Sequence, residues 1–145
     1  MPSPDSARPD PSGDATAVPD LARLFEPRAV AVVGASTDRT RAGTQAIVAL
    51  QAAGFAGPIY PVNPKREQIE SLRCYPSIDT VPRPCDLAVV AVGAEQVPGV
   101  IRQCDAAGIG FAVVFSAGFR EIGARGADAQ AELDRAIREI GRAHV

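Results

Sequence analysis

The segment best suited to chemistry is a loop of small and hydroxyl-bearing residues that follows a short apolar run. The run from Ala29 to Val33 ends at Gly34, and the loop continues as Ala35, Ser36, Thr37, Asp38, Arg39, Thr40 and Arg41. A glycine permits a sharp turn, and small residues let a phosphate approach main-chain N–H groups and the positive end of a following helix. The hydroxyls add hydrogen-bond donors and the arginines add charge. The pattern favours a phosphate-bearing ligand, although a structural strand-to-helix turn with solvated arginines fits the same residues.

A second polar group follows the apolar run Ile59 to Val62 and consists of Asn63, Pro64, Lys65 and Arg66. Folds that bind NAD usually place Asp or Glu at the end of this strand, where the carboxylate accepts the ribose hydroxyls. Two cations instead suit a phosphorylated ribose, as in coenzyme A (CoA) or NADP. A charged start to a short surface helix is the structural alternative.

The dinucleotide fingerprint GxGxxG is incomplete in this chain. Counting from the end of the first apolar run, its three positions hold Gly34, Ser36 and Arg39, so only the first glycine is present. This departure weakens an NADP interpretation, which rests on the cations after the second run.

Two further loops follow apolar runs later in the chain. Gly93 and Ala94 offer small residues and accessible backbone, which suit a thin ligand passing closely. Ser116, Ala117 and Gly118 offer a hydroxyl and a glycine at a strand end. Because Ser116 has neither a histidine partner nor a GxSxG elbow, we do not expect it to act as a hydrolase nucleophile.

No residue pattern indicates catalysis or metal binding. The single histidine, His144, lies next to the C-terminus, where it cannot be packed from both sides. Three widely spaced cysteines form no CxxC pair, so reduced thiols are expected rather than a metal site or a disulfide.

Apolar runs alternate with helical periods along the rest of the chain. Strands are predicted at Ala29–Val33, Ile59–Val62, Leu87–Val92 and Phe111–Phe115, and helices around Ala46–Ala53, Val97–Cys104 and Leu133–Ile140. Ile69 and Leu72 suggest a further brief helix that Pro76 would end. On the last helix, Leu133, Ile137 and Ile140 form the apolar stripe, and Gly141 follows it.

This order predicts an α/β fold, a doubly wound, Rossmann-like parallel sheet with helices on both faces. Ligands of such sheets bind beyond the carboxyl ends of the strands, where the strand order reverses. The segment Arg142–Val145 resembles the start of one more strand, so the chain is expected to be a fragment truncated near its last strand.

Length and charge narrow the possibilities further. The 145 residues suit one domain, with residues 1–20 as a disordered leader rich in Pro, Asp, Ser and Gly and residues 21–145 as the folded part. A net charge of −2 excludes general binding to nucleic-acid backbones. Without a membrane-length apolar run or a signal segment, the chain is expected in the cytoplasm.

Five segments in order resemble the CoA-binding domain of the ADP-forming (NDP-forming) acyl-CoA synthetases, relatives of the succinyl-CoA synthetase alpha subunit. They are Leu24–Ser36, Gly54–Pro64, Tyr75–Ile78, Asp86–Val90 and Ser116–Gly123. The likeness covers the chain from about Leu21 onward. It departs from the family pattern at Gly93, where proline is usual, and at Ser71, where glycine is usual and the local turn is therefore in doubt.

The resemblance implies a CoA site across the ends of the strands. Gly34, Ala35 and Ser36 would approach the CoA phosphates, and Asn63, Pro64 and Lys65 would flank its nucleotide end. Gly93 and Ala94 would line the pantetheine path, with Ser116, Ala117 and Gly118 close to it. Arg39 joins this set on its charge alone.

The same resemblance implies a role in a larger enzyme. Acetate–CoA ligases of this type work through a phosphohistidine and an ATP-grasp module, which further domains or a partner subunit would supply, so this chain is expected to bind CoA without ligating anything. The alternatives are a CoA-binding regulatory domain of a protein lysine acetyltransferase and an NADP-binding module. A stand-alone CoA-binding protein is a further possibility.

Overall fold

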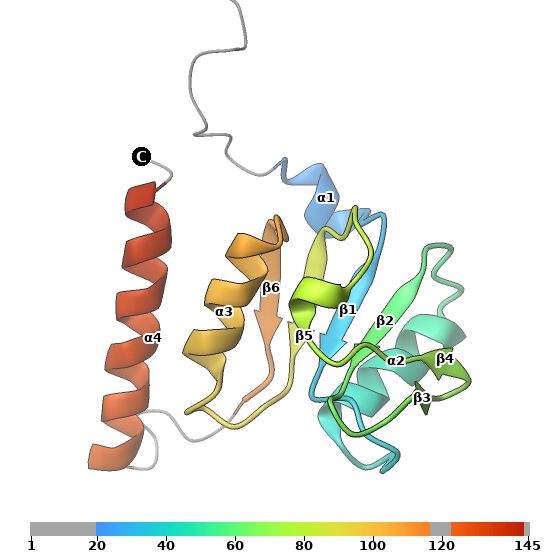
Figure 1. The fold of residues 1–145 in the computed structure, drawn as a ribbon, viewed down its shortest axis with the longest axis horizontal. Coiled ribbons are helices and arrows are strands. Elements are labelled where there is room, and N and C mark those ends of the chain that lie inside the picture. The colour runs from blue at the N-terminus through green and yellow to red at the C-terminus, as the bar shows by residue number, and fades with distance from the viewer. Residues whose placement is uncertain (1–19, 117–122, 144–145) are drawn as a thin grey trace, which may run out of the picture.

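A four-stranded parallel sheet forms the centre of the molecule (Figure 1). The computed structural model describes residues 20–116 and 123–143. The strands are β1 (Val30–Val33), β2 (Ile59–Val62), β5 (Leu87–Val90) and β6 (Phe111–Val114), in the spatial order β2-β1-β5-β6. All three pairings are parallel and in register, with Val30 opposite both Ile59 and Leu87. The predicted Rossmann-like sheet is confirmed.

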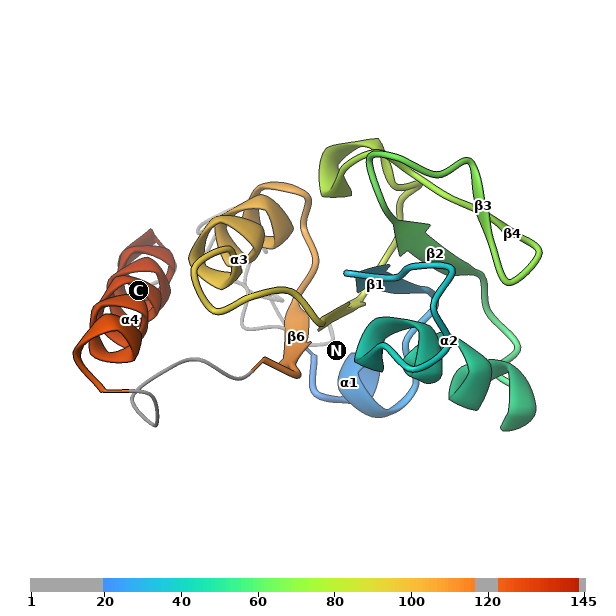
Figure 2. The ribbon, with the colours of Figure 1, turned by 90° about the horizontal axis from the view of Figure 1, so that it is seen from below.

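Helices cover both faces of this sheet (Figure 2). The helices are α1 (Ala22–Phe25), α2 (Ala42–Ala52), α3 (Val97–Ala106) and α4 (Ala124–Ala143), with a 3-10 turn, η1, at Ile78–Thr80. Helices α1 and α2 lie on one side, and α3 and η1 lie on the other. Helix α4 lies beyond α3, away from the centre of the sheet.

Two apolar clusters hold the layers together, one on each face. Ala31 and Val33 of β1 point into the cluster beneath α3 and η1, whereas Val30 and Val32 point toward Ile47 of α2. All four β1 residues are buried, as expected for a strand covered on both faces. The edge strand β6 is less covered than its sequence suggests, because Val113 and Val114 are each 37% exposed.

The brief helix predicted around Ile69 and Leu72 is wrong, because these residues belong to a hairpin. Strands β3 (Gln68–Ile69) and β4 (Leu72–Arg73) pair antiparallel, with Ile69 directly opposite Leu72. A spacing of three residues places two side chains on one face of a helix, and it also places them opposite each other across a two-residue turn. The spacing therefore could not distinguish the two structures.

The turn of this hairpin has a conformation that L-residues rarely adopt. Glu70 and Ser71 have φ of 51° and 64°, the left-handed pair of a type I′ turn, in which Asn and Gly are preferred. Ser71 is the position at which the resembling family usually has glycine, and the tight turn forms with serine in its place.

We expect Ser71→Gly to raise the free energy of unfolding by about 0.5–1 kcal/mol. Glycine removes the left-handed backbone strain of serine, and this gain exceeds the extra conformational entropy that glycine loses on folding. The measurement is urea denaturation of both proteins. The matched control is Ser77→Gly, which should lower stability because Ser77 has extended backbone, with φ of −156°. A Ser71→Gly protein no more stable than the wild type would contradict the prediction.

The last helix differs from its sequence pattern. Helix α4 runs through Gly141 to Ala143, so the further strand predicted to begin at Arg142 is wrong at its first two residues. Ile137, expected on the apolar stripe, is 53% exposed. Leu133 of the same stripe does pack against the core cluster, and the buried residues beside it are the small Ala129 and Ala136.

Several predictions concern segments outside the described residues. The leader expected over residues 1–20 lies there except for Asp20, as do Ala117, Gly118 and His144.

None of the helices in the described part of the chain combines the length and hydropathy that a membrane span requires.

Candidate functional site

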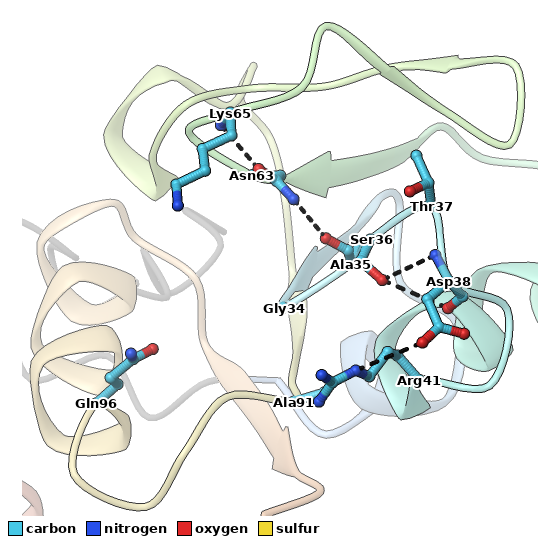
Figure 3. A pocket seen from close by; sticks show the side chains of 10 residues that line it. All are labelled: Gly34, Ala35, Ser36, Thr37, Asp38, Arg41, Asn63, Lys65, Ala91 and Gln96. Atoms are coloured by element: carbon cyan, nitrogen blue, oxygen red, sulfur yellow. Dashed lines mark hydrogen bonds and ion pairs between the residues drawn. The ribbon is translucent and has the colours of Figure 1, made fainter.

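A cavity of about 630 Å³ opens where the strand order reverses, between the carboxyl ends of β1 and β5 (Figure 3). The helices that follow these strands, α2 and α3, leave toward opposite faces of the sheet, which is the usual place for a ligand in an open parallel sheet. Its volume suits a medium-sized organic ligand. The lining residues are Gly34, Ala35, Ser36, Thr37, Asp38, Arg41, Asn63, Lys65, Ala91 and Gln96.

Two glycines bring the backbones around this cavity into close contact. Gly34 leaves β1 with φ of 93°, and a Cβ there would lie 2.1 Å from the carbonyl oxygen of Ala91. Gly43 lies in the first turn of α2, and its Cβ would lie 2.7 Å from the carbonyl oxygen of Gly34. Gly43 thus provides the close helix–strand packing that the last glycine of the GxGxxG fingerprint provides elsewhere.

The first half of the loop after β1 is fastened from two directions. The buried Thr44 hydroxyl accepts a hydrogen bond from the Ser36 N–H (3.0 Å) and donates one to the Ser36 carbonyl (2.7 Å). From the other side, the Asn63 amide donates to the Ala35 carbonyl (2.9 Å). Its oxygen accepts from the Lys65 N–H (2.8 Å). Asn63 therefore joins the loop after β2 to the loop after β1.

The charged residues of the lining are Lys65, Arg41 and Asp38, which leaves a net positive charge. Figure 3 shows Lys65 and Arg41 on opposite sides of Ala35 and Ser36. The Asp38 carboxylate accepts hydrogen bonds from the Thr40 hydroxyl and N–H, and these contacts lower its pKa. It also lies 3.8 Å from the Arg41 guanidinium. The carboxylate is therefore engaged within its own loop.

Two helix N-termini face the cavity without a capping side chain. The cap residues, Arg41 of α2 and Gln96 of α3, both line the cavity, and neither makes a side-chain capping hydrogen bond. A cation at a helix N-terminus is disfavoured by the helix dipole, and an anion there is favoured. The arrangement of Arg41 beside the start of α2 is thus suited to an anionic ligand between them.

The structure brings together five of the predicted site residues and places others elsewhere. Those that line the cavity are Gly34, Ala35, Ser36, Asn63 and Lys65; Arg39, Pro64, Gly93, Ala94 and Ser116 are outside its lining. The Arg39 guanidinium is paired with Glu70. The Ser116 hydroxyl donates to the Val92 carbonyl and thereby joins the loops after β5 and β6.

Sequence reasoning missed four residues around the cavity. Gly43 and Thr44 support the loop from α2, while Ala91 and Gln96 line the cavity after β5. Gln96 directly precedes the predicted start of α3, so its position at a helix N-terminus was a usable signal. Thr44 gave no such signal, because its partner lies eight residues earlier in the loop.

The three cysteines lie in the core of the fold, away from the cavity. Cys74, Cys85 and Cys104 are buried free thiols, and burial raises the pKa of Cys104 to about 12. Among the described residues, no three His, Cys, Asp or Glu side chains gather closely enough to hold a metal ion.

Comparisons with known proteins show the family to which the chain belongs. The CoA-binding domain family matches residues 28–144, and the chain belongs to it. The chain is 44% identical over 127 residues to the acetate–CoA ligase (ADP-forming) II of Archaeoglobus fulgidus, covering 88% of this chain and 18% of that protein. It is 39% identical over 119 residues to the trans-feruloyl-CoA synthase FCS1 of an unknown prokaryotic organism, covering 82% of this chain and 17% of that protein.

Solved structures agree with these relatives. The fold superposes on the dinucleotide-forming acetyl-coenzyme A synthetase 1 of Ca. Korarchaeum cryptofilum in complex with phosphate and ADP, with a TM-score of 0.76 and 43% identity. It also superposes on PH0766 of Pyrococcus horikoshii, with a TM-score of 0.74 and 32% identity. Each match covers 84% of this chain, and 26% and 28% of those chains respectively. The chain therefore corresponds to the CoA-binding part of much longer proteins.

Proposed function

We propose that this chain binds CoA in the cavity between β1 and β5 and serves as the CoA-binding part of an ADP-forming acyl-CoA synthetase. The observation that carries the proposal is the cavity itself. It joins two uncapped helix N-termini and two cations at the switch point of a sheet that belongs to the CoA-binding domain family. A polyanionic nucleotide matches each of these features.

The proposal assigns the phosphates of CoA to the loop of Gly34, Ala35 and Ser36. The small side chains leave the backbone accessible, and Arg41 supplies positive charge beside the first turn of α2. Lys65 is assigned to the phosphorylated ribose, because its side chain lines the cavity from the loop after β2.

The pantetheine arm is assigned to the loops after β5 and β6. Gly93 is exposed and a Cβ there would meet no atom within 4 Å, so a thin chain has room to pass. Ala94 is buried beside it, and Ser116 holds the two loops together through the Val92 carbonyl. Ala117 and Gly118 complete this assignment from the sequence alone.

Ligation is assigned to other parts of a larger assembly. Because the chain spans less than a fifth of the first curated relatives, we propose that further domains or a partner subunit supply the phosphorylated histidine and the ATP-dependent step. The assembly would act in the cytoplasm, and the chain alone would bind CoA without catalysis.

Lys65→Ala is expected to weaken CoA binding by about ten- to a hundredfold, the loss of one charge-assisted contact worth about 1.5–3 kcal/mol. Dephospho-CoA, which lacks the ribose phosphate, should lose far less. The control is Arg66→Ala, which removes the neighbouring cation outside the cavity lining and should leave both affinities near wild type. Equal losses for CoA and dephospho-CoA would remove Lys65 from the phosphate contact.

Calorimetric titration of the chain with CoA, dephospho-CoA, NADP and NAD in one buffer tests the proposal as a whole. CoA should bind most tightly and NAD most weakly, because the end of β2 carries cations and no carboxylate. A preference for NADP would replace the proposal with an NADP-binding module. A folded chain that binds none of the four would refute CoA binding by this chain alone.

A further inference from the structure

An ion pair ties the loop after β1 to the β3–β4 hairpin. The Arg39 Nε donates to one oxygen of the Glu70 carboxylate (2.9 Å), and its terminal nitrogen donates to the other (2.7 Å). The two residues are 31 positions apart. This bidentate geometry is the strong and directional form of an Arg–carboxylate contact. The Glu70 side chain is only 14% exposed although it belongs to a turn, whereas that of Arg39 is 73% exposed.

The hairpin that carries Glu70 is anchored at its base. Ile69 is buried in the cluster under α2, and Leu72 packs against the same cluster. The turn between them holds Glu70 at φ of 51°, a conformation that costs a non-glycine residue energy and is retained where surrounding contacts determine it. The contact with Arg39 also lowers the pKa of Glu70, because the guanidinium favours the ionised carboxylate. The hairpin thus holds the largely buried Glu70 side chain in a fixed position, where its carboxylate pairs with Arg39.

Residues 37–40, in the second half of the loop after β1, have few other connections. Ser36 is fastened by Thr44, as described above, but Asp38 bonds to Ser36, Thr40 and Arg41, all within the loop. In the described part of the chain, the hydrogen bonds and ion pairs that connect residues 37–40 to a segment outside this loop come from Arg39. Arg39 itself is absent from the cavity lining, whereas Asp38 and Arg41 on either side of it are present.

We infer that Arg39 and Glu70 are positioning residues, and that the hairpin acts as a strut that holds residues 37–41 in place around the cavity, beside the Gly34, Ala35 and Ser36 backbone to which the phosphates are assigned. This inference rests on the proposed function for the identity of the ligand. It differs from the sequence expectation, in which Arg39 itself contacts a phosphate. Loss of the strut would leave the chain folded but reduce the fraction of molecules with a binding-competent loop, and the apparent affinity would fall in proportion to the fraction that remains competent.

The test is a double-mutant cycle with Arg39→Gln, Glu70→Gln and the double variant, measured by CoA titration. If the pair only positions the loop, each single change should weaken CoA binding by a similar factor of about ten, and the double variant should be no weaker than either. The swapped variant R39E/E70R should recover part of the loss. The control is Arg135→Gln, which breaks the exposed pair with Glu132 on α4, outside the cavity lining, and should leave CoA affinity unchanged.

A direct phosphate contact predicts a different pattern. Glu70→Gln would then leave affinity equal to wild type or stronger, since it would release Arg39 to the ligand. Arg39→Gln would also reduce the dependence of CoA affinity on salt, because it would remove a contact between opposite charges. Under the positioning role, that salt dependence should match the wild type. An unchanged or stronger CoA affinity in Glu70→Gln would overturn the inference, and so would a reduced salt dependence in Arg39→Gln.

Hydrogen exchange of the ligand-free protein separates this inference from the proposed function. The amides of residues 36–41 should exchange faster in Glu70→Gln than in the wild type, while those of β1 stay protected. Unchanged exchange in the loop would refute the strut whether or not CoA binds. A folded wild type that fails to bind CoA, with faster loop exchange in the variant, would refute the proposed ligand and retain the strut.

Discussion

Replacing Gly34 with alanine is expected to destabilise the chain by about 2–5 kcal/mol. Its φ of 93° is unfavourable for any residue with a Cβ, and the added atom would lie 2.1 Å from the Ala91 carbonyl oxygen. Because the neighbour is backbone of the adjacent strand end, relief requires β1 and β5 to move apart, which costs what overpacking of a core costs. The measurement is the free energy of unfolding from urea denaturation.

Gly54 provides a matched control for this prediction. It follows Ala53, the C-terminal cap of α2, with φ of 74°, yet a Cβ there would meet no atom within 4 Å. Gly54→Ala therefore incurs only the conformational cost, about 1–2 kcal/mol. The difference between the two variants measures the contact with Ala91. Equal losses would show that the close approach of β1 and β5 contributes nothing beyond backbone conformation.

The same substitution should affect the cavity as well as the fold. Gly34 and Ala91 both line the cavity, so any separation of their backbones changes its shape. In the fraction of Gly34→Ala molecules that remains folded, we expect CoA binding to be lost, whereas Gly54→Ala should bind as the wild type does. Retained affinity in the folded Gly34→Ala protein would move the ligand away from this turn.

The strands of the sheet were predictable because burial on both faces leaves a continuous apolar run. The run Ile59–Val62 is β2 residue for residue, and the runs before Gly34 and after Asp86 contain β1 and β5. Edge position is a different matter, since the composition of β6 resembles that of a central strand while part of its surface is exposed. Exposure at an edge depends on what lies beside the strand, and the strand's own sequence does not carry that information.

The cavity was only partly predictable for a related reason. Loop position after a strand identified Gly34, Ser36, Asn63 and Lys65, because the carboxyl ends of parallel strands meet at one edge. The contacts that decide each side chain's role are between distant segments. Charge alone placed Arg39 toward the ligand, whereas its partner Glu70 is 31 residues away in a hairpin that helical spacing concealed.

The two ends of the sheet have different roles: the cavity lies at the carboxyl ends of the strands, and a stabilising contact lies at their amino ends. At the carboxyl ends, backbones approach closely and leave polar groups facing a cavity. At the amino ends, Asp86 joins three strands: its N–H donates to the Ala29 carbonyl, its own carbonyl accepts from Phe111, and its carboxylate accepts from Arg28. Changes at this second end should alter stability without altering ligand affinity.

Asp86→Asn is therefore expected to lower the free energy of unfolding by about 1.5–3 kcal/mol, the cost of losing hydrogen bonds to a buried charged group. The Asp86 side chain is 9% exposed, and its carboxylate accepts from the Arg28 N–H (2.8 Å) and from the Arg28 guanidinium (2.9 and 2.7 Å). An amide provides one acceptor and turns its NH₂ toward those donors. Glu95→Gln, which breaks an exposed pair with Arg125, should change stability by less than about 1 kcal/mol.

The same carboxylate should make the wild type sensitive to acid. Hydrogen bonds from Arg28 lower the pKa of Asp86 from 3.8 to about 2 in the folded chain. A group with a depressed folded pKa contributes stability above its unfolded pKa, and the contribution disappears as the pH falls from about 4 toward 2. The difference in unfolding free energy between wild type and Asp86→Asn should thus be largest near neutral pH and shrink over that interval, with CoA affinity at neutral pH equal in both. A difference independent of pH would mean that the charge of Asp86 contributes nothing, and that the variant loses only a hydrogen-bond acceptor.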